Sequence, residues 1–203
     1  MHNTLPTKSH YPDYDVMKEQ EHWDPHTQSI VAARLHSEYG FRFLTLVEAE
    51  QLGILAGLLT GDDRAEIVSY IVSSIDESLG GAIGESERKA GVPKAQELMR
   101  QGLRLLDAAS VLLFQAPYIS IAKDKQRLLL EGLGEDRPQP EPTWRGFPAK
   151  PFFMKLMSLS HQAYYSHPTV WSEIGYGGPA YPRGYIRAHP NQLDPWEAKK
   201  SGQ

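Results

Sequence analysis

One segment of this chain repeats an aliphatic residue at every fourth position. The repeating residues are Ile67, Ile71, Ile75 and Leu79. Because residues four apart lie on one side of an α-helix, the pattern predicts an amphipathic helix with one buried face. Asp63 and Glu66 match a capping box at its start, and Gly80-Gly81 predicts its end. The stripe must be covered, so we expect it to pack against a long apolar helix over 98–114.

Other segments also have helical rather than strand-like patterns. Their boundary residues are Thr45 with Glu48, Pro93, Ser120 and Pro151 at the starts, and Gly61, Pro117 and Gly132 at the ends. No segment combines sustained apolar alternation with the turn dipeptides of a hairpin. The predicted fold class is therefore all-α, a helical bundle with extended Pro/Gly/aromatic segments at both ends.

Prolines and glycines divide the chain into three parts. Residues 1–25 are predicted to form an extended N-terminal arm. Residues 26–166 are predicted to form the helical bundle, including a proline-rich connector at 134–151. Residues 167–203 are predicted to form an irregular C-terminal tail.

Composition excludes several classes of function. The 203 residues include 21 Lys and Arg against 25 Asp and Glu, which argues against nucleic-acid binding. Cysteine is absent, which excludes disulfides, thiolate zinc sites, iron–sulfur clusters and a cysteine nucleophile in this chain. No apolar run reaches the ~20 residues of a membrane-spanning helix. The start has no apolar export signal, so we expect a cytoplasmic location, or a periplasmic one if a leader is missing or another protein carries the signal.

Two histidines are the candidate metal ligands. His22 and His26 are four residues apart, with Asp24 and Pro25 between them. Because Pro25 interrupts a regular helix, Asp24 is better explained as a helix cap followed by proline at the first helical position. His167 is expected at the C-terminal end of a helix.

The sequence has no recognisable catalytic or nucleotide-binding motif. The glycine-rich run at 80–84 follows a predicted helix and lacks the G-x-G-x-x-G order of a dinucleotide loop. No catalytic, cofactor-binding or metal-binding residue is therefore predicted.

The segment 167–185 has an unusual composition. Its nineteen residues include three prolines, four glycines, three tyrosines and one tryptophan. Such a segment gains order by lying on its own bundle or on another protein, and Tyr, Trp and Arg are the residues most enriched at interface hot spots. We predict a partner interface made of His167, Pro168, Trp171, Tyr176, Pro179, Tyr181, Pro182, Arg183, Gly184 and Tyr185.

This segment, with Tyr164-Tyr165 before it, resembles the C-terminal signature of the gluconate 2-dehydrogenase subunit 3 family. The front of the chain, at 11–17 and 23–27, is similar to a branch of that family without an export leader. Members are small subunits of bacterial flavoprotein dehydrogenase complexes that act on sugars and sugar acids.

The resemblance implies a role by association. A separate large subunit of the glucose-methanol-choline oxidoreductase type would bind FAD and oxidise the sugar hydroxyl, and this chain would hold no cofactor. The small subunit would support the folding and stability of that flavoprotein. A cytochrome c commonly accepts the electrons, although the missing leader argues against a periplasmic cytochrome here.

Three hypotheses follow from the sequence. The chain is a non-catalytic subunit of an FAD-dependent sugar dehydrogenase or oxidase, or a free-standing helical scaffold that binds another protein. A metalloprotein that uses His22, His26 and a distant ligand is the third.

Overall fold

The computed structural model describes residues 9–36, 40–81, 90–187, 189 and 192–199. Within these residues the regular elements are helices and none is a strand, which confirms the predicted all-α class. The chain forms two compact units. We call Glu38–Ala163 the helical unit, and Met1–Ser37 together with Tyr164–Gln203 the terminal unit.

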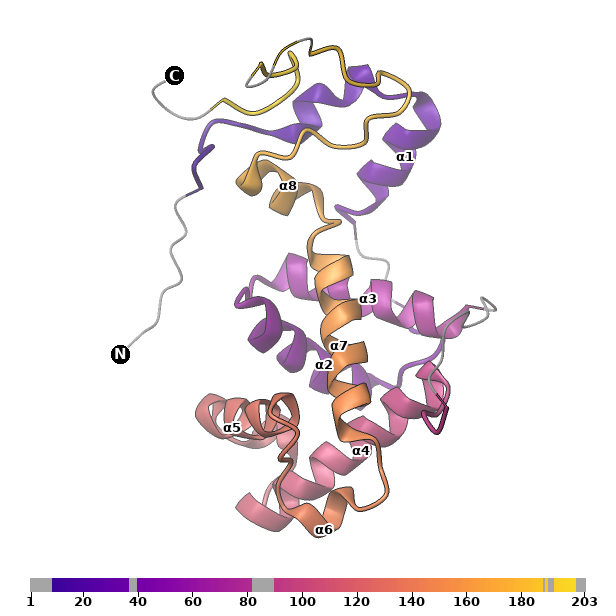
Figure 1. Ribbon diagram of the computed structural model, residues 1–203, viewed down its shortest axis with the longest axis vertical. Helices are drawn as coiled ribbons and strands as arrows, with labels where there is room; N and C mark the ends of the chain where they lie inside the picture. Colours follow the sequence, from indigo (N-terminus) through magenta and orange to yellow (C-terminus); the bar gives the residue numbers. More distant parts are fainter. Residues whose placement is uncertain (1–8, 37–39, 82–89, 188, 190–191, 200–203) are drawn as a thin grey trace. The chain divides into compact units, whose positions relative to one another are not determined.

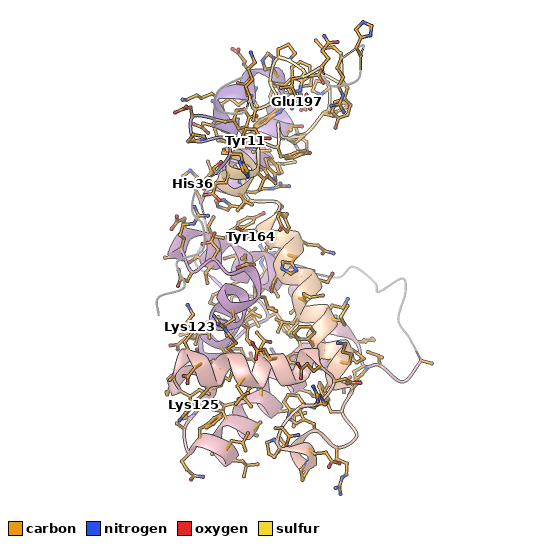
Figure 2. The ribbon with its side chains drawn as sticks, turned by 60° about the vertical axis from the view of Figure 1, so that its left-hand side comes forward. Tyr11, His36, Lys123, Lys125, Tyr164 and Glu197 are labelled. Atoms are coloured by element: carbon orange, nitrogen blue, oxygen red, sulfur yellow. The ribbon has the colours of Figure 1, made fainter. Side chains whose placement is uncertain are left out.

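The helical unit contains most of the regular structure (Figure 1). Its elements are α2 (Leu46–Thr60), α3 (Ala65–Gly80), α4 (Ala95–Phe114), the 3-10 helix η2 (Tyr118–Ser120), α5 (Lys123–Gly134), α6 (Glu141–Trp144) and α7 (Ala149–Tyr164). Helix α2 packs on both α3 and α4, and α6 packs on α4. Lys125 of α5, which Figure 2 labels, has its ammonium 4.9 Å from the ring centroid of Phe114 at the end of α4.

The aliphatic stripe of α3 lies in the core of this unit. Its members, Ile67, Ile71, Ile75 and Leu79, are all buried. Helix α3 contacts both α2 and α4, so the predicted burial against the helix over 98–114 is confirmed and α2 supplies a second covering face. Helix α3 runs to Gly80, where the sequence predicted its end.

Helices α4 and α7 approach closely at a glycine. A Cβ atom built on Gly102 of α4 would lie 2.3 Å from Cδ2 of Phe152 of α7. Phe152 is fully buried, so its ring occupies the space that any other side chain at 102 would need.

Asp76 of α3 fixes the segment that leads into α2. Its carboxylate is only 3% exposed and accepts hydrogen bonds from the backbone N–H groups of Arg42, Phe43 and Leu44, at 2.7, 3.0 and 2.7 Å. Three donors satisfy a buried carboxylate that would otherwise be costly to desolvate. Arg100 adds a contact from α4, with its guanidinium 4.2 Å from the ring centroid of Phe43.

The two predicted capping boxes have different outcomes. The one at Thr45 and Glu48 is confirmed, because each side chain bonds the other residue's backbone N–H. The one at Asp63 is wrong, because α3 follows Arg64 without a side-chain cap. The carboxylate before this helix that accepts hydrogen bonds is Asp62, which binds the backbone N–H and the guanidinium of Arg64.

Three other predicted helix starts are displaced. Ser120 closes the 3-10 turn η2 by donating its N–H to Pro117, and α5 begins only at Lys123. Pro93 precedes α4 rather than opening it, and Pro151 is the third residue of α7. Proline is tolerated anywhere in a first turn, where backbone N–H groups have no intrahelical acceptor, so it places a helix start only to within a few residues.

The sequence predicted an extended connector, but the proline-rich segment is not extended throughout. Its first residue, Gly134, ends α5, its last residues open α7, and α6 lies between them. Trp144 of α6 is buried and its ring centroid lies 5.9 Å from that of Phe147. Aromatic burial therefore orders a segment that proline content alone predicts as a spacer.

The terminal unit joins both ends of the chain. Its elements are the 3-10 helix η1 (Val16–His22), α1 (Pro25–Ala33) and α8 (Pro168–Ile174). A small apolar core is formed by Val16, Trp23, Val31 and Trp171. The backbone N–H of Val16 also donates to Ser172 Oγ at 3.0 Å.

The terminal unit corrects two sequence predictions. The described part of the N-terminal arm contains η1, and the tail contains α8 where only irregular structure was predicted. In each case the helix buries residues against the other end of the chain, a gain that local composition does not reveal.

No helix within the described ranges is both long enough and apolar enough to cross a membrane.

Candidate functional site

The predicted interface begins at α8. His167 follows α7 and caps α8, with its Nδ1 accepting from the N–H of Thr169 at 3.2 Å. The prediction of a histidine at a helix C-terminus is therefore corrected, because the imidazole acts at the N-terminus of the next helix. Trp171 is buried, donates from Nε1 to Tyr165 O at 2.6 Å, and has the guanidinium of Arg34 5.3 Å from its ring centroid.

The glycines after α8 let the chain pass close to aromatic rings. Gly175 has φ of +74°, and a Cβ there would lie 2.4 Å from the ring of Tyr11, which Figure 2 labels in the terminal unit. Gly178 has φ of +79°, and a Cβ there would lie 2.5 Å from the ring of Trp23. Only glycine combines this backbone conformation with these approaches. The segment 175–178 thus lies directly on residues from the front of the chain.

Arg183 is bound inside the terminal unit. Its Nη2 donates to the carbonyls of Gly177 and Gly178, the second at 3.4 Å. Its guanidinium lies over the indole of Trp196, 4.5 Å from the ring centroid. Burial lowers the pKa of Arg183 from its usual value, and the nearby Tyr14 and Glu19 oppose that shift. Its Nε and Nη1 are buried without a hydrogen-bond partner in the described part of the chain.

Trp196 connects this arginine to the front of the chain. The ring of His22 lies 5.5 Å from the Trp196 ring, and the hydroxyl of Tyr14 donates to the Trp196 carbonyl at 2.8 Å. Burial, together with the negative charge of Glu19, raises the pKa of Tyr14 to about 12. Tyr14 is therefore a neutral hydrogen-bond donor at any ordinary pH.

Residues 180–186, which we call the aromatic turn, are fixed at two backbone positions. The N–H of Gly184 donates to Ala180 O at 2.6 Å. The N–H of Ile186 donates to Oδ1 of Asp194 at 2.9 Å, and Asp194 is only 1% exposed. Asp194 is held in turn, because its own N–H donates to the carboxylate of Glu197 at 2.8 Å.

The large side chains of the aromatic turn point into solvent. Tyr181 is 74% exposed, Tyr185 is 62% exposed and Ile186 is 61% exposed. Tyr176, just before the turn, is also exposed, although its ring makes an edge contact with Trp171 at 5.3 Å between centroids. Exposed aromatic side chains on a fixed backbone are typical of protein-binding surfaces.

The structure divides the predicted interface residues into three groups. His167, Pro168 and Trp171 are buried within the terminal unit, Pro179 and Arg183 are partly buried, and Tyr176, Tyr181, Pro182, Gly184 and Tyr185 are exposed. The surface open to a partner is thus the later part of the predicted segment.

Three residues of this site were not singled out from the sequence. They are Ile186, Asp194 and Trp196. The sequence around Trp196 does indicate a turn, because an Asp-Pro pair, Asp194-Pro195, lies beside the tryptophan, as Asp24-Pro25 lies beside Trp23.

The histidine pair considered for metal binding has other contacts. Asp24 caps α1 by accepting from the N–H groups of His26 and Thr27, which confirms the helix-cap interpretation. His22 Nε2 lies 3.4 Å from a carboxylate oxygen of Glu19. The described residues contain no group of three or more histidine, cysteine or acidic side chains arranged to hold a metal ion.

A pocket of about 440 Å³ lies in the helical unit, around the connector. Its charged lining residues are Asp136, Glu141, Arg145 and Lys150. Lys150 already donates to the carbonyl of Gly134. Charges of both signs favour neither an anionic nor a cationic ligand, so the pocket defines no chemistry.

These features describe an all-α protein whose two ends form one unit with an anchored, exposed aromatic turn. The family model "Gluconate 2-dehydrogenase subunit 3" matches residues 61–178, more than half of the chain. The chain belongs to the gluconate 2-dehydrogenase subunit 3 family. The match ends at Gly178, before the aromatic turn. No curated protein and no solved structure is significantly similar to the chain.

Proposed function

We propose that this chain is a non-catalytic small subunit that binds and stabilises a large FAD-dependent dehydrogenase subunit. The family name describes the third subunit of a gluconate 2-dehydrogenase, which supports membership of a dehydrogenase complex. The large subunit would be of the glucose-methanol-choline oxidoreductase type and would oxidise a hydroxyl of a sugar, sugar acid or glycoside. A cytochrome c is a candidate electron acceptor for such a complex.

The flavin belongs to the partner in this proposal. Dinucleotide sites of the Rossmann type need a strand, a glycine-rich loop and a helix N-terminus to hold the pyrophosphate. The regular elements in the described ranges are all helices, which does not fit that site. We therefore expect the full chain, purified without a partner, to contain no stoichiometric flavin.

The observation that carries the proposal is the exposure of Tyr181, Tyr185 and Ile186 on an anchored backbone. Each side chain offers a large apolar area, and each tyrosine also offers a hydroxyl for a hydrogen bond. In a monomer these exposed side chains lower the solubility and gain no packing contacts, whereas an interface would bury them.

Copurification followed by a visible absorption spectrum tests the proposal. The full chain, tagged and produced in its source cells, should retain a flavoprotein with visible flavin absorbance and dehydrogenase activity toward sugars or sugar acids. A colourless protein without a flavoprotein partner would overturn the proposal.

A second candidate function is a free-standing helical scaffold. It is favoured by the internal contacts of two predicted interface residues: Trp171 donates to Tyr165 O, and Arg183 lies over Trp196, both within the terminal unit. A scaffold would be stable as a monomer and would retain partners other than a flavoprotein in the same experiment.

A further inference from the structure

We infer that Arg183 positions the aromatic turn for the dehydrogenase subunit and does not itself contact that subunit. This inference rests on the proposed function and concerns how the interface is formed. Sequence reasoning favoured the opposite role, because an arginine between proline and glycine in an aromatic segment matches a direct hot-spot contact.

The side chain of Arg183 is held by contacts within the terminal unit. Its Nη2 is bound to the carbonyls of Gly177 and Gly178, and one face of the guanidinium is covered by Trp196. Its Nε and Nη1 are buried. A carboxylate on a partner therefore meets no open guanidinium edge at these two nitrogens.

Arg183 is partly buried, whereas the residues on both sides of it are exposed. Tyr181 and Tyr185 lie two residues before and after it, and both are largely exposed. The inward arginine thus lies at the centre of a turn whose aromatic side chains point outward. Gly184 N–H closes this turn onto Ala180, and Ile186 N–H joins it to Asp194.

An ordered turn lowers the entropic cost of binding. A segment rich in glycine and proline has no ladder of backbone hydrogen bonds, so ordering it at the moment of association would weaken the complex. The contacts of Arg183, Asp194 and Trp196 order the aromatic turn before the partner arrives. The dehydrogenase subunit would then meet a fixed surface of two tyrosines and one isoleucine.

This geometry also indicates the chemistry of the opposing surface. Two phenol rings and an aliphatic side chain are complementary to an apolar hollow, with hydrogen-bond acceptors at its rim for the two hydroxyl groups.

The test compares variants of the full chain in two measurements. Hydrogen exchange in the free chain reports the backbone order of the turn through the amides of Gly184 and Ile186. Titration against the flavoprotein that copurifies with the wild-type chain reports affinity. Arg183→Ala is expected to speed exchange of both amides and to weaken binding, each at least tenfold.

Two further variants separate positioning from direct contact. Arg183→Lys keeps the charge but loses the planar group over Trp196, so we expect it to behave like Arg183→Ala. Arg137→Ala removes the same charge from an exposed side chain of the helical unit and should leave exchange at Gly184 unchanged. If Arg183→Lys restores affinity while exchange at Gly184 and Ile186 stays fast, the charge contacts the partner and the inference is wrong.

The other outcomes are also decisive. If Arg183→Ala weakens binding while exchange stays at the wild-type rate, Arg183 contacts the partner directly and the inference is wrong. Faster exchange with unchanged affinity would show that order in the turn does not matter for binding, which also overturns the inference.

If Tyr181→Ala and Tyr185→Ala also leave the affinity unchanged, the interface itself is misplaced and the proposed function loses its main support. If no flavoprotein copurifies, the proposed function fails and the inference falls with it.

Discussion

The guanidinium of Arg183 lies 4.5 Å from the ring centroid of Trp196, and this pair joins the aromatic turn to the last described segment of the chain. A cation over an indole ring is favourable, more so when the pair is shielded from water. Trp196 also accepts at its carbonyl the hydroxyl of Tyr14. Trp196 thus joins the aromatic turn to the front of the chain.

Trp196→Ala should lower the free energy of unfolding of the terminal unit by about 3–5 kcal/mol, the usual loss for truncating a buried aromatic side chain. Trp196→Phe keeps an aromatic face under Arg183 and should cost less. Hydrogen exchange of the amides of Val16 and Trp171 reports this unit separately from the helical unit. Equal protection in Trp196→Ala and the wild type would show that Trp196 adds nothing to the stability of this unit.

Gly102→Ala should destabilise the helical unit, because the Phe152 ring fills the position of the new methyl group. Overpacking of this kind costs roughly 1–3 kcal/mol, more than the ~1 kcal/mol that alanine gains over glycine inside a helix. Gly57→Ala in α2 is the matched control, because a Cβ there meets its nearest atom at 3.5 Å. Thermal unfolding should show a lower midpoint for Gly102→Ala and an equal or higher one for Gly57→Ala. The reverse order would contradict the packing of α7 on α4.

Asp76→Asn should destabilise the helical unit by at least about 2 kcal/mol, since hydrogen bonds to a charged group contribute about 1.5–3 kcal/mol each. The amide group of asparagine would also bring its own donors toward three backbone N–H groups. Glu77→Gln removes one charge from the next, exposed residue of α3 and serves as the control. Denaturant unfolding of both variants checks the prediction, and equal midpoints would show that the carboxylate of Asp76 is not needed.

Alkaline pH should destabilise the terminal unit through Tyr14. The pKa of Tyr14 in the folded chain, about 12, lies above the usual tyrosine value of 10.0. Between these two values the unfolded chain has lost the phenolic proton while the folded chain keeps it, so the free energy of unfolding falls as pH rises.

Tyr14→Phe should be less stable than the wild type at pH 7, because the hydrogen bond to Trp196 is lost, but should lose less stability above pH 10. Tyr118 of the helical unit also has a raised pKa from burial, so exchange at Val16 is the appropriate local readout.

The sequence predicts the helical unit well where a helix has both a period and clear ends. The period of α3, its end at Gly80 and the capping box at Thr45 are each set by residues close together in the sequence. Helix starts marked only by proline or serine are displaced, because such residues are compatible with several first-turn positions.

The terminal unit is harder to predict because its contacts join the two ends of the chain. Ser9 Oγ donates to Glu173 O at 2.6 Å, and Val16 N–H donates to Ser172 at 3.0 Å, across more than 150 residues in each case. Composition indicates correctly that an aromatic, glycine-rich segment must lie on another surface. It does not indicate that Arg183 lies partly buried against Trp196 while Tyr181 and Tyr185 point outward.

The affinity of a double variant tests whether the aromatic turn binds the dehydrogenase subunit. Tyr181→Ala with Tyr185→Ala in the full chain is titrated against the flavoprotein that copurifies with the wild type. Tyr165→Ala is the matched control, because Tyr165 is 56% exposed in the same unit but lies outside the turn.

The double variant should bind at least 30-fold more weakly, equivalent to about 2 kcal/mol for a hot-spot loss. The control should bind within about threefold of the wild type, a change below about 1 kcal/mol. Wild-type affinity in the double variant, with hydrogen exchange showing that the terminal unit is still folded, would show that the aromatic turn is not the interface.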